Sequence, residues 1–194
     1  MKIRILMLAV GVMTVAVGSA QLEKMVSTPG AKKITVAVYD RLGVEKDSLF
    51  QDGEYPATIS IQSWEVLWRP NDYQIVTDLG YMYGNIERKD LELATYVRYR
   101  KAYPKIAEAY YPEAEFYFKN RSYKPVVALL EPTITMNPKP HANTFRLLAH
   151  AYDRLGMLKE SLATWEAYLV LSPDDAAAKV NRDKVKAKLN DGGS

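Results

Sequence analysis

Apolar residues recur at helical spacing in the last third of the chain. Over residues 145–152 they occupy one face of an α-helix, at intervals of three, four and seven positions. Gly156 is expected to end this helix, because glycine tolerates the left-handed conformation found at helix C-termini. A second apolar stripe follows over residues 158–171, and Pro173 stops it. The pattern predicts two antiparallel helices joined by a tight turn, an αα-hairpin.

The hairpin pattern repeats with a period of 34 residues. Four prolines are separated by 34, 34 and 35 residues, and series of tyrosines and small residues keep the same step. Several series that share one period indicate a repeat architecture rather than chance. The small residues are expected where two helices approach most closely, and the aromatic residues are expected in the core. The series are Pro70, Pro104, Pro138 and Pro173; Tyr83, Tyr117 and Tyr152; and Gly80, Ala114 and Ala149.

These units resemble the tetratricopeptide repeat family, whose unit is a helix–turn–helix of the same length. The match covers roughly residues 53–175. The resemblance implies an all-α fold, an antiparallel helix-hairpin repeat array (an α-solenoid) of about three to four units within residues 39–175. Residues 176–194 are expected to form a C-terminal capping helix and a tail. The last unit matches through Phe145, Leu148, Ala149, Tyr152, Gly156, Ser161, Trp165 and Pro173.

Prolines interrupt the third unit. Pro112 lies several residues into the nominal first helix, so that helix is expected to begin or kink there. Pro132 lies inside the nominal second helix, where a proline typically costs about 3 kcal/mol. The pattern predicts a divergent repeat with bent helices, and a bend shaped for a partner is the alternative.

The N-terminal unit fits two registers. One register predicts a helix over residues 31–42 that ends at Gly43, and the other predicts a helix over residues 56–68 after Gly53. The two registers differ by ten residues, so an insertion is expected between Gly43 and Gly53. Alternating apolar residues at 34–38 are also typical of a strand. No second strand exists to pair with it, so a helix is favoured.

The first twenty residues have the pattern of a secretory signal peptide. A short basic start precedes an apolar run, and residues 18–20 place small side chains at the positions that signal peptidase inspects. The apolar run is shorter than the roughly 18–20 residues that a spanning helix needs. Residues 1–20 are therefore expected to be cleaved before Gln21, and the protein to be exported to the periplasm or secreted. Residues 21–38 are expected to form a partly flexible N-terminal lead.

Composition and charge exclude several classes of function. The chain of 194 residues contains no Cys, which excludes a disulfide, a thiolate nucleophile and a Cys-based metal site. Its formal net charge is +3, and removing the first twenty residues lowers the charge to +1. A mature chain so near neutrality lacks the positive field expected of a nucleic-acid binder. No later stretch is apolar enough to predict a membrane span in the mature chain.

Candidate catalytic chemistry is nearly absent from the sequence. The only two histidines, His141 and His150, are nine residues apart, which is not a ligand spacing on one helix. No H-x-x-x-H motif, glycine-rich phosphate loop or nucleophile elbow appears. No motif in the sequence pairs two carboxylates for general acid–base catalysis. We therefore expect a non-enzymatic protein with no metal site and no cofactor.

In the family that the chain resembles, the first helices of the repeats line a concave binding surface. Carried over by register, the inward positions are polar and aromatic, which suits an extended peptide or a helix. The partner is therefore expected to be a protein or a peptide. The family's clamp for C-terminal carboxylates is not supported. One of the positions that it requires is occupied in successive repeats by Tyr81, Glu115 and His150. The inward positions are Gln74, Thr77 and Tyr81; Glu108, Tyr111, Glu115, Phe118 and Lys119; and Asn143, Arg146, His150 and Arg154.

Two classes of function are compatible with such an array. The first is a protein–protein interaction module in a bacterial-type cell envelope or the secreted space, which binds through its concave surface. The second is a structural or assembly component of an envelope or secretion complex, which binds through its outer face or its ends. Substitution of the concave residues separates the two, because only the first class requires them for binding.

Overall fold

A computed structural model describes residues 29–191 of the chain, and this part is helical with no strand. The predicted all-α fold class is therefore confirmed. The signal-peptide segment lies outside the described residues. The elements are α3 (Pro29–Gln51), α4 (Tyr55–Trp68), α5 (Tyr73–Asn85), α6 (Lys89–Ala102), η1 (Ala107–Tyr110), α7 (Tyr111–Lys119), α8 (Tyr123–Leu130), η2 (Glu131–Thr135), α9 (Ala142–Arg154), α10 (Leu158–Leu171) and α11 (Ala176–Asp191).

The chain divides after Thr58 into two compact units. In the first unit, the expected helix end at Gly43 is wrong, because α3 continues through this glycine to Gln51. A glycine inside a helix costs only about 1 kcal/mol relative to alanine, so it does not by itself end one. The turn lies instead at Gly53, whose φ of 76° is the left-handed value that favours glycine. The helix predicted over residues 56–68 is confirmed by α4.

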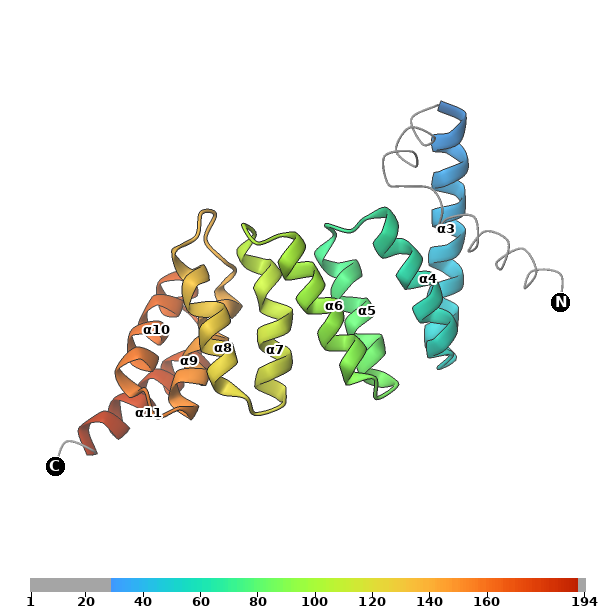
Figure 1. The fold of residues 1–194 in the computed structure, drawn as a ribbon. Coiled ribbons are helices and arrows are strands. Elements are labelled where there is room, and N and C mark those ends of the chain that lie inside the picture. Colours follow the sequence, from blue (N-terminus) through green and yellow to red (C-terminus); the bar gives the residue numbers. More distant parts are fainter. Residues whose placement is uncertain (1–28, 192–194) are drawn as a thin grey trace. The chain divides into compact units, whose positions relative to one another are not determined.

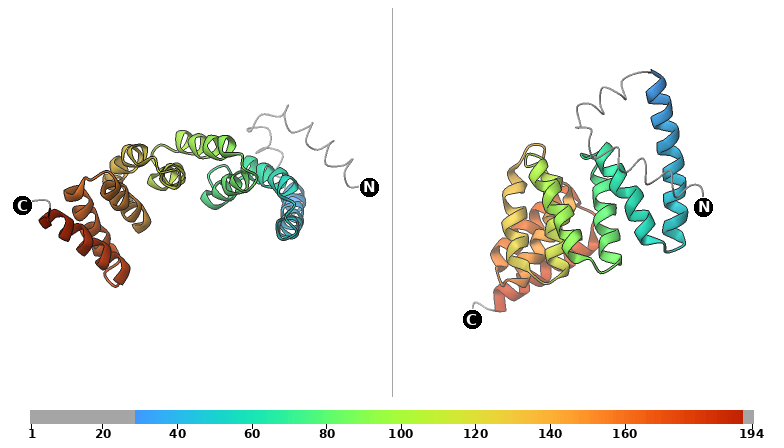
Figure 2. Two further views of the ribbon diagram at one scale, coloured as in Figure 1. Left: turned by 90° about the horizontal axis from the view of Figure 1, so that it is seen from below. Right: turned by 45° about the vertical axis from the view of Figure 1, so that its right-hand side comes forward.

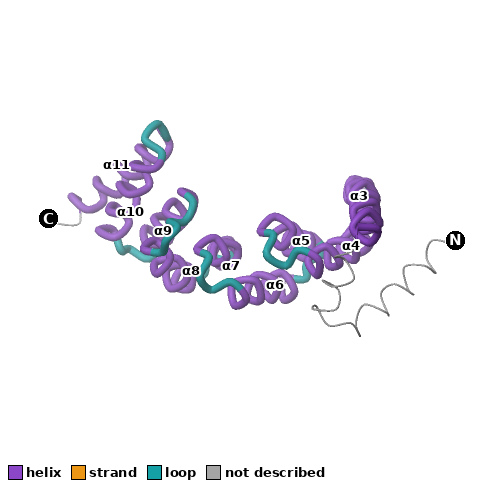
Figure 3. Tube along the Cα trace, turned by 90° about the horizontal axis from the view of Figure 1, so that it is seen from above, coloured by secondary structure: helices purple, strands orange, loops and turns teal. Residues whose placement is uncertain are grey.

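The second unit is a series of antiparallel helix pairs (Figure 1). α5 pairs with α6, α7 with α8, and α9 with α10, while α11 packs against α10. Consecutive pairs meet where α6 contacts α7 and where α8 contacts α9, and α9 also contacts α7. Figure 3 shows α5 and α7 on one side of this unit and α6 and α8 on the other, and the left view of Figure 2 agrees. We call the side formed by α5, α7 and α9 the first-helix surface.

The last hairpin has the ends that the sequence predicts. α9 ends at Arg154, and Gly156 has a φ of 74°. The N–H of Met157 then donates to the carbonyl of Tyr152 at 2.9 Å, which satisfies one of the last carbonyls of the helix. α10 ends before Pro173. The turn between the two helices is therefore set by one glycine and its local hydrogen bonds.

Three hydrophobic clusters fill the second unit, one for each hairpin and its neighbours. Tyr152 and Trp165 are buried, as predicted, whereas Tyr83 and Tyr117 are half-buried at the margins of their clusters. The first cluster is Ile59, Val66, Ile75, Val76, Leu79, Met82, Tyr99 and Ala109. The second is Ala114, Val126, Leu130, Leu147, Leu148, Ala151 and Tyr152. The third is Phe145, Ala149, Trp165, Tyr168, Ala178 and Val185.

The small residues of the repeat lie where helices approach closely, as the periodicity predicts. A Cβ atom on Gly80 would collide with the ring of Tyr96 on the paired helix. Ala114 and Ala149 are fully buried. The hydroxyl of Ser161 donates to the carbonyl of Ala149 at 2.9 Å, so a side chain of α10 directly contacts the backbone of α9. This spacing between paired helices leaves no room for a bulky side chain at these positions.

The helices of the third unit are short. The first one begins next to Pro112, as predicted, whereas the second one ends before Pro132 instead of bending there. The segment before Pro112 is the 3₁₀ helix η1, and α7 begins at Tyr111. α8 ends at Leu130, and the segment that contains Pro132 is the 3₁₀ helix η2. A proline removes one backbone donor and clashes with the preceding turn, so α8 ends before Pro132. Pro112 is tolerated in the first turn of α7, because the backbone N–H groups there have no partner within the helix.

A buried ion pair joins the second hairpin to the third. Glu113 on α7 has only 4% of its surface exposed, and its Oε2 accepts a hydrogen bond from Nε of Arg100 at 2.6 Å. The guanidinium of Arg100 also lies 5.6 Å from the ring centre of Tyr110. The hydrogen bond to Glu113 raises the pKa of Arg100, so the guanidinium stays charged. The contact gives α6 and α7 a specific polar junction in addition to their apolar packing.

Candidate functional site

The described residues hold no group of three or more His, Asp or Glu side chains arranged for a metal ion. Within the same range, no helix has both the length and the apolar character needed to cross a membrane. His141 has a structural position as the N-cap of α9, where its Nδ1 accepts a hydrogen bond from the N–H of Asn143 at 3.3 Å.

The predicted positions on α5 are mostly solvent-exposed. Tyr81 has 56% of its surface exposed, and Gln74 is exposed and donates to Oδ1 of Asp78 at 2.6 Å. The hydroxyl of Thr77 donates to the carbonyl of Tyr73, one turn earlier in the same helix, at 2.9 Å. Of these side chains, Tyr81 offers the largest accessible apolar area.

The predicted positions on α7 and α9 form a mixed surface. On α7, Lys119 pairs with Glu115 at 2.9 Å, and the ring of Phe118 lies 6.4 Å from that of His150. On α9, Arg146 and Arg154 are exposed, while Asn143 and His150 are half-buried. Phe118 and His150 thus connect the third repeat to the fourth.

Tyrosine and glutamate side chains from three helices lie close together beside α7. We call them the tyrosine–glutamate cluster. Burial raises the pKa of Tyr73 to about 12, and the neighbouring Tyr111 and Glu115 add to the shift. Burial and the charge of Glu115 raise the pKa of Tyr111 to about 12 as well. Burial and the nearby carboxylates also raise the pKa of Tyr96. The phenols are therefore neutral hydrogen-bond donors over the whole physiological range. The members are Tyr73 of α5, Glu92 and Tyr96 of α6, and Tyr111 and Glu115 of α7.

Glu92 of this cluster lies within the electrostatic influence of Glu115. Burial raises the pKa of Glu92, and the charge of Glu115 acts in the same direction. Lys119 opposes this effect, because its ammonium group is close enough to stabilise the ionised form of Glu92. Lys119 therefore interacts electrostatically with Glu92 of α6 and forms its ion pair with Glu115 of α7.

His150 lies between aromatic rings and cationic side chains. Its ring packs edge-to-face on the buried Trp165, with centroids 4.8 Å apart. Burial lowers the pKa of His150 below its ordinary value of 6.5, the charge of Arg146 lowers it further, and Asp153 opposes the shift. The neutral imidazole is therefore favoured in the folded protein.

This depression of the His150 pKa predicts that acid destabilises the fold. Between the folded-state pKa of His150 and 6.5, the unfolded chain binds a proton more tightly than the folded chain does. The contribution of His150 to the free energy of unfolding is therefore complete above pH 6.5 and is lost as the pH falls through the folded-state pKa. Urea titrations at a series of pH values should show a free energy of unfolding that declines from about pH 7 towards pH 5. His150→Phe should flatten part of this decline. An unchanged pH dependence in the variant would contradict the assignment.

Three members of the tyrosine–glutamate cluster were not among the predicted site residues. Glu92 occupies a position where the repeat pattern expects a small residue, and Tyr96 follows it one turn later on the same helix face. Tyr73 lies at the start of α5, one position before the predicted Gln74. Glu92 itself is the sequence feature that could have predicted this part of the cluster on α6. A charged residue at a position where helices pack closely requires polar neighbours.

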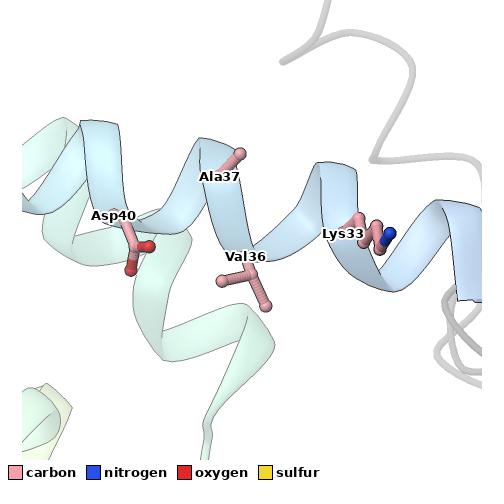
Figure 4. A pocket seen from close by; sticks show the side chains of 4 residues that line it. All are labelled: Lys33, Val36, Ala37 and Asp40. Carbon is pink, nitrogen blue, oxygen red and sulfur yellow. The ribbon is translucent and has the colours of Figure 1, made fainter.

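A shallow depression also lies on the first unit. Its lining residues follow one another on one face of α3, with an ammonium group near one end and a carboxylate near the other (Figure 4). They come from a single helix and do not converge on a common point, so the depression carries no functional assignment. They are Lys33, Val36, Ala37 and Asp40.

The helix pairs, their common period and the small residues at their contacts define an all-α helical repeat fold of the tetratricopeptide type. Solved structures share this fold. One is "MamA 41-end from Desulfovibrio magneticus RS-1", with a TM-score of 0.61 and 16% identity over 79% of this chain and 86% of that chain. Another is "First TPR of Spaghetti (RPAP3) bound to HSP90 peptide SRMEEVD", with a TM-score of 0.54 and 18% identity over 61% of this chain and 93% of that chain.

The structure "MamA AMB-1 P212121" is similar as well, with a TM-score of 0.59 and 18% identity over 79% of this chain and 84% of that chain. No protein-family model matches the sequence, and no curated protein matches it. At identities this low the likeness concerns the fold, because stacked helix pairs of one geometry serve many different partners.

Proposed function

We propose that this protein is a non-enzymatic protein–protein interaction module that binds a peptide or a protein segment on its first-helix surface. The observation that carries the proposal is the set of accessible aromatic and charged side chains that α5, α7 and α9 present outside the hydrophobic clusters. Tyr81 and Arg146 are exposed there, and Tyr111 and Phe118 are half-buried. Aromatic residues and Arg are the side chains on which binding energy concentrates in protein interfaces.

The geometry of the surface suits a peptide. Side chains of three successive hairpins follow one another along it, so an extended or helical segment can contact several repeats at once. In the RPAP3 structure the partner is a peptide, SRMEEVD, bound to a domain of the same fold. This supports a peptide as the class of partner, while the different side chains here call for a different peptide.

A second candidate is a structural component that binds through its end. Apolar side chains are exposed near the C-terminal end of the second unit, and Val170 has 80% of its surface exposed. Leu171 beside it and Val180 on α11 are also exposed. An apolar end of a repeat stack is a surface on which another subunit could pack. In this case the partner would contact α10 and α11 rather than the first-helix surface.

Replacing Tyr81 and Arg146 together with alanine tests the proposal. Neither side chain belongs to a hydrophobic cluster, so the fold should remain intact. Partner binding should weaken by about 2 kcal/mol or more if the two act as anchors. The measurement is affinity capture from the native cells, with the captured proteins quantified by mass spectrometry and the fold checked by circular dichroism.

The matched control is the double variant Arg98→Ala with Val170→Ala, which removes an exposed arginine from α6 and an exposed apolar residue from α10. The first-helix proposal expects this control to capture partners like the wild type. If only the control loses its partners, the structural alternative replaces the proposal. If the Tyr81/Arg146 variant is folded and binds the same partners equally well, the proposal fails.

We further propose that the protein is exported to the periplasm or the secreted space. The support is the basic start, the short apolar run and the small residues before Gln21. Mass-spectrometric mapping of the native protein should therefore find Gln21 as the first residue. A native protein that retains Met1 would exclude cleavage and, with it, this route of export.

A further inference from the structure

The first-helix surface carries opposite charges in its two halves. The tyrosine–glutamate cluster places two carboxylates beside α7, and Glu108 also acts on Tyr73 there. On α9, by contrast, Arg146 and Arg154 are exposed and form no ion pair with any residue of the range 29–191. Their carboxylate neighbour Asp153 is already paired with Lys188 of α11, at 2.6 Å. The charge of Arg146 also acts on Asp175, just before α11, but this carboxylate already accepts hydrogen bonds from the hydroxyl of Tyr168 at 2.7 Å and from the N–H of Ala178 at 2.9 Å. Neither Asp153 nor Asp175 therefore forms an ion pair with the two arginines.

Tyr111 of α7 packs against the second hydrophobic cluster, to which α9 contributes Leu147 and Leu148, so its ring lies at the boundary between the two halves. Glu115 and Arg146 act on its phenol with opposite effects, so a carboxylate and a guanidinium both lie near this one half-buried ring. The ring offers an apolar face together with a neutral hydroxyl donor. A partner that covers Tyr111 therefore meets negative charge on the side of α6 and α7 and positive charge on the side of α9.

We propose that the partner is a peptide segment with a Lys or Arg side chain that meets Glu115 and Glu92, an apolar residue on Tyr111, and an acidic side chain that meets Arg146. This inference rests on the proposed function and specifies the chemistry of the partner. Charge complementarity selects this occupant, because a peptide of one sign would face like charge in one half of the surface. The surrounding tyrosine rings add attraction for a cation.

Lys119 occupies the cationic position in the free protein. Its ammonium group pairs with Glu115 and lies near Glu92, so the chain itself supplies a positive charge where the partner's basic side chain is expected. Lys119 has 65% of its side chain exposed, and an exposed pair of this kind is held only weakly. An incoming Lys or Arg can therefore displace it. Removing Lys119 should strengthen binding of the basic residue.

The probe is a library of random peptides that is selected on the purified protein and, in parallel, on the Glu115→Lys and Arg146→Glu variants. Peptides selected on the wild type should contain a basic residue and an acidic residue on either side of an apolar one. Glu115→Lys should abolish the preference for the basic residue, and Arg146→Glu should abolish the preference for the acidic one. Both substituted side chains lie at least partly in solvent, so the fold is expected to persist.

The affinity of a selected peptide then separates a direct contact from an indirect effect. Glu115→Gln should weaken binding by about 3- to 10-fold, and Lys119→Gln should strengthen it by about 2-fold. Replacing the basic residue of the peptide with Gln should remove most of the effect of Glu115→Gln, because the two charges then no longer interact. Arg98→Gln on α6 is the control and should leave the affinity unchanged.

The possible results distinguish failure of the charge inference from failure of the proposed peptide-binding function. Selected peptides that lack a basic residue, or that bind the wild type and Glu115→Gln equally well, overturn the inference about charge while the proposed peptide-binding function stands. If no peptide is enriched on the native protein relative to the urea-unfolded protein, both the inference and the proposed function fail. Enrichment of peptides with the predicted charges on the wild type, together with loss of the matching charge preference in Glu115→Lys and Arg146→Glu, supports both the inference and the proposed function.

Discussion

Replacing Trp165 with alanine is expected to lower the free energy of unfolding by about 3–5 kcal/mol. Trp165 has only 1% of its surface exposed, and its ring packs edge-to-face with His150 at 4.8 Å and with Tyr168 at 5.8 Å. Alanine would leave a cavity in the third cluster, where α9, α10 and α11 meet. Urea denaturation followed by far-UV circular dichroism measures the loss.

Trp68→Ala provides the comparison for this experiment. Trp68 is only half-buried and packs against Trp64 with centroids 4.8 Å apart, so its removal should cost clearly less. A loss below about 1 kcal/mol for Trp165→Ala would be typical of a surface residue. Such a result would mean that Trp165 does not hold the last hairpin and the capping helix together.

Ala149→Trp should destabilise the protein by overfilling the same region. Ala149 is fully buried, and its carbonyl accepts the hydroxyl of Ser161 from the paired helix at 2.9 Å. An indole at this position would force α9 and α10 apart, which typically costs about 1–3 kcal/mol or more. The change should also break the hydrogen bond from Ser161 and thereby leave a buried hydroxyl without its partner.

Ala163→Trp on α10 is the matched control for this overpacking, because Ala163 is exposed and the added indole can extend into solvent. Thermal unfolding of both variants compares the two positions directly. A large fall in Tm is expected for Ala149→Trp and little change for Ala163→Trp. Equal Tm values for the two variants would show that the assigned register of the hairpin is wrong.

The repeat architecture could be predicted because its determinants are local and periodic. Gly156 has the positive φ that its place after a helix requires, and Ala149 fits a contact that admits no larger side chain. The N-terminal part was harder, because Gly43 resembles a helix-ending glycine in its local sequence. Whether a glycine ends a helix depends on the backbone that follows it, and here the left-handed turn is made by Gly53 instead.

The candidate site was predictable only in part. Register placed Tyr111 and Glu115 on the first-helix surface, since positions within one helix follow from helical periodicity. Tyr73, Glu92 and Tyr96 join them only through the contact of α6 with α7 and the pairing of α5 with α6. Distances between elements depend on how helices pack, and no spacing in the sequence reports them directly. A single tyrosine, moreover, carries no signal that separates a core position from a binding position.

The central claim is that partners bind across the first-helix surface, and site-specific photo-crosslinking tests it most directly. A photo-reactive p-benzoylphenylalanine would replace Tyr81 on α5 in one protein and Ala163 on α10 in another, since both positions are exposed. After irradiation in the native cells, the account predicts a defined crosslinked partner from position 81 and none from position 163. A partner crosslinked from position 163 and absent from position 81 would contradict the account.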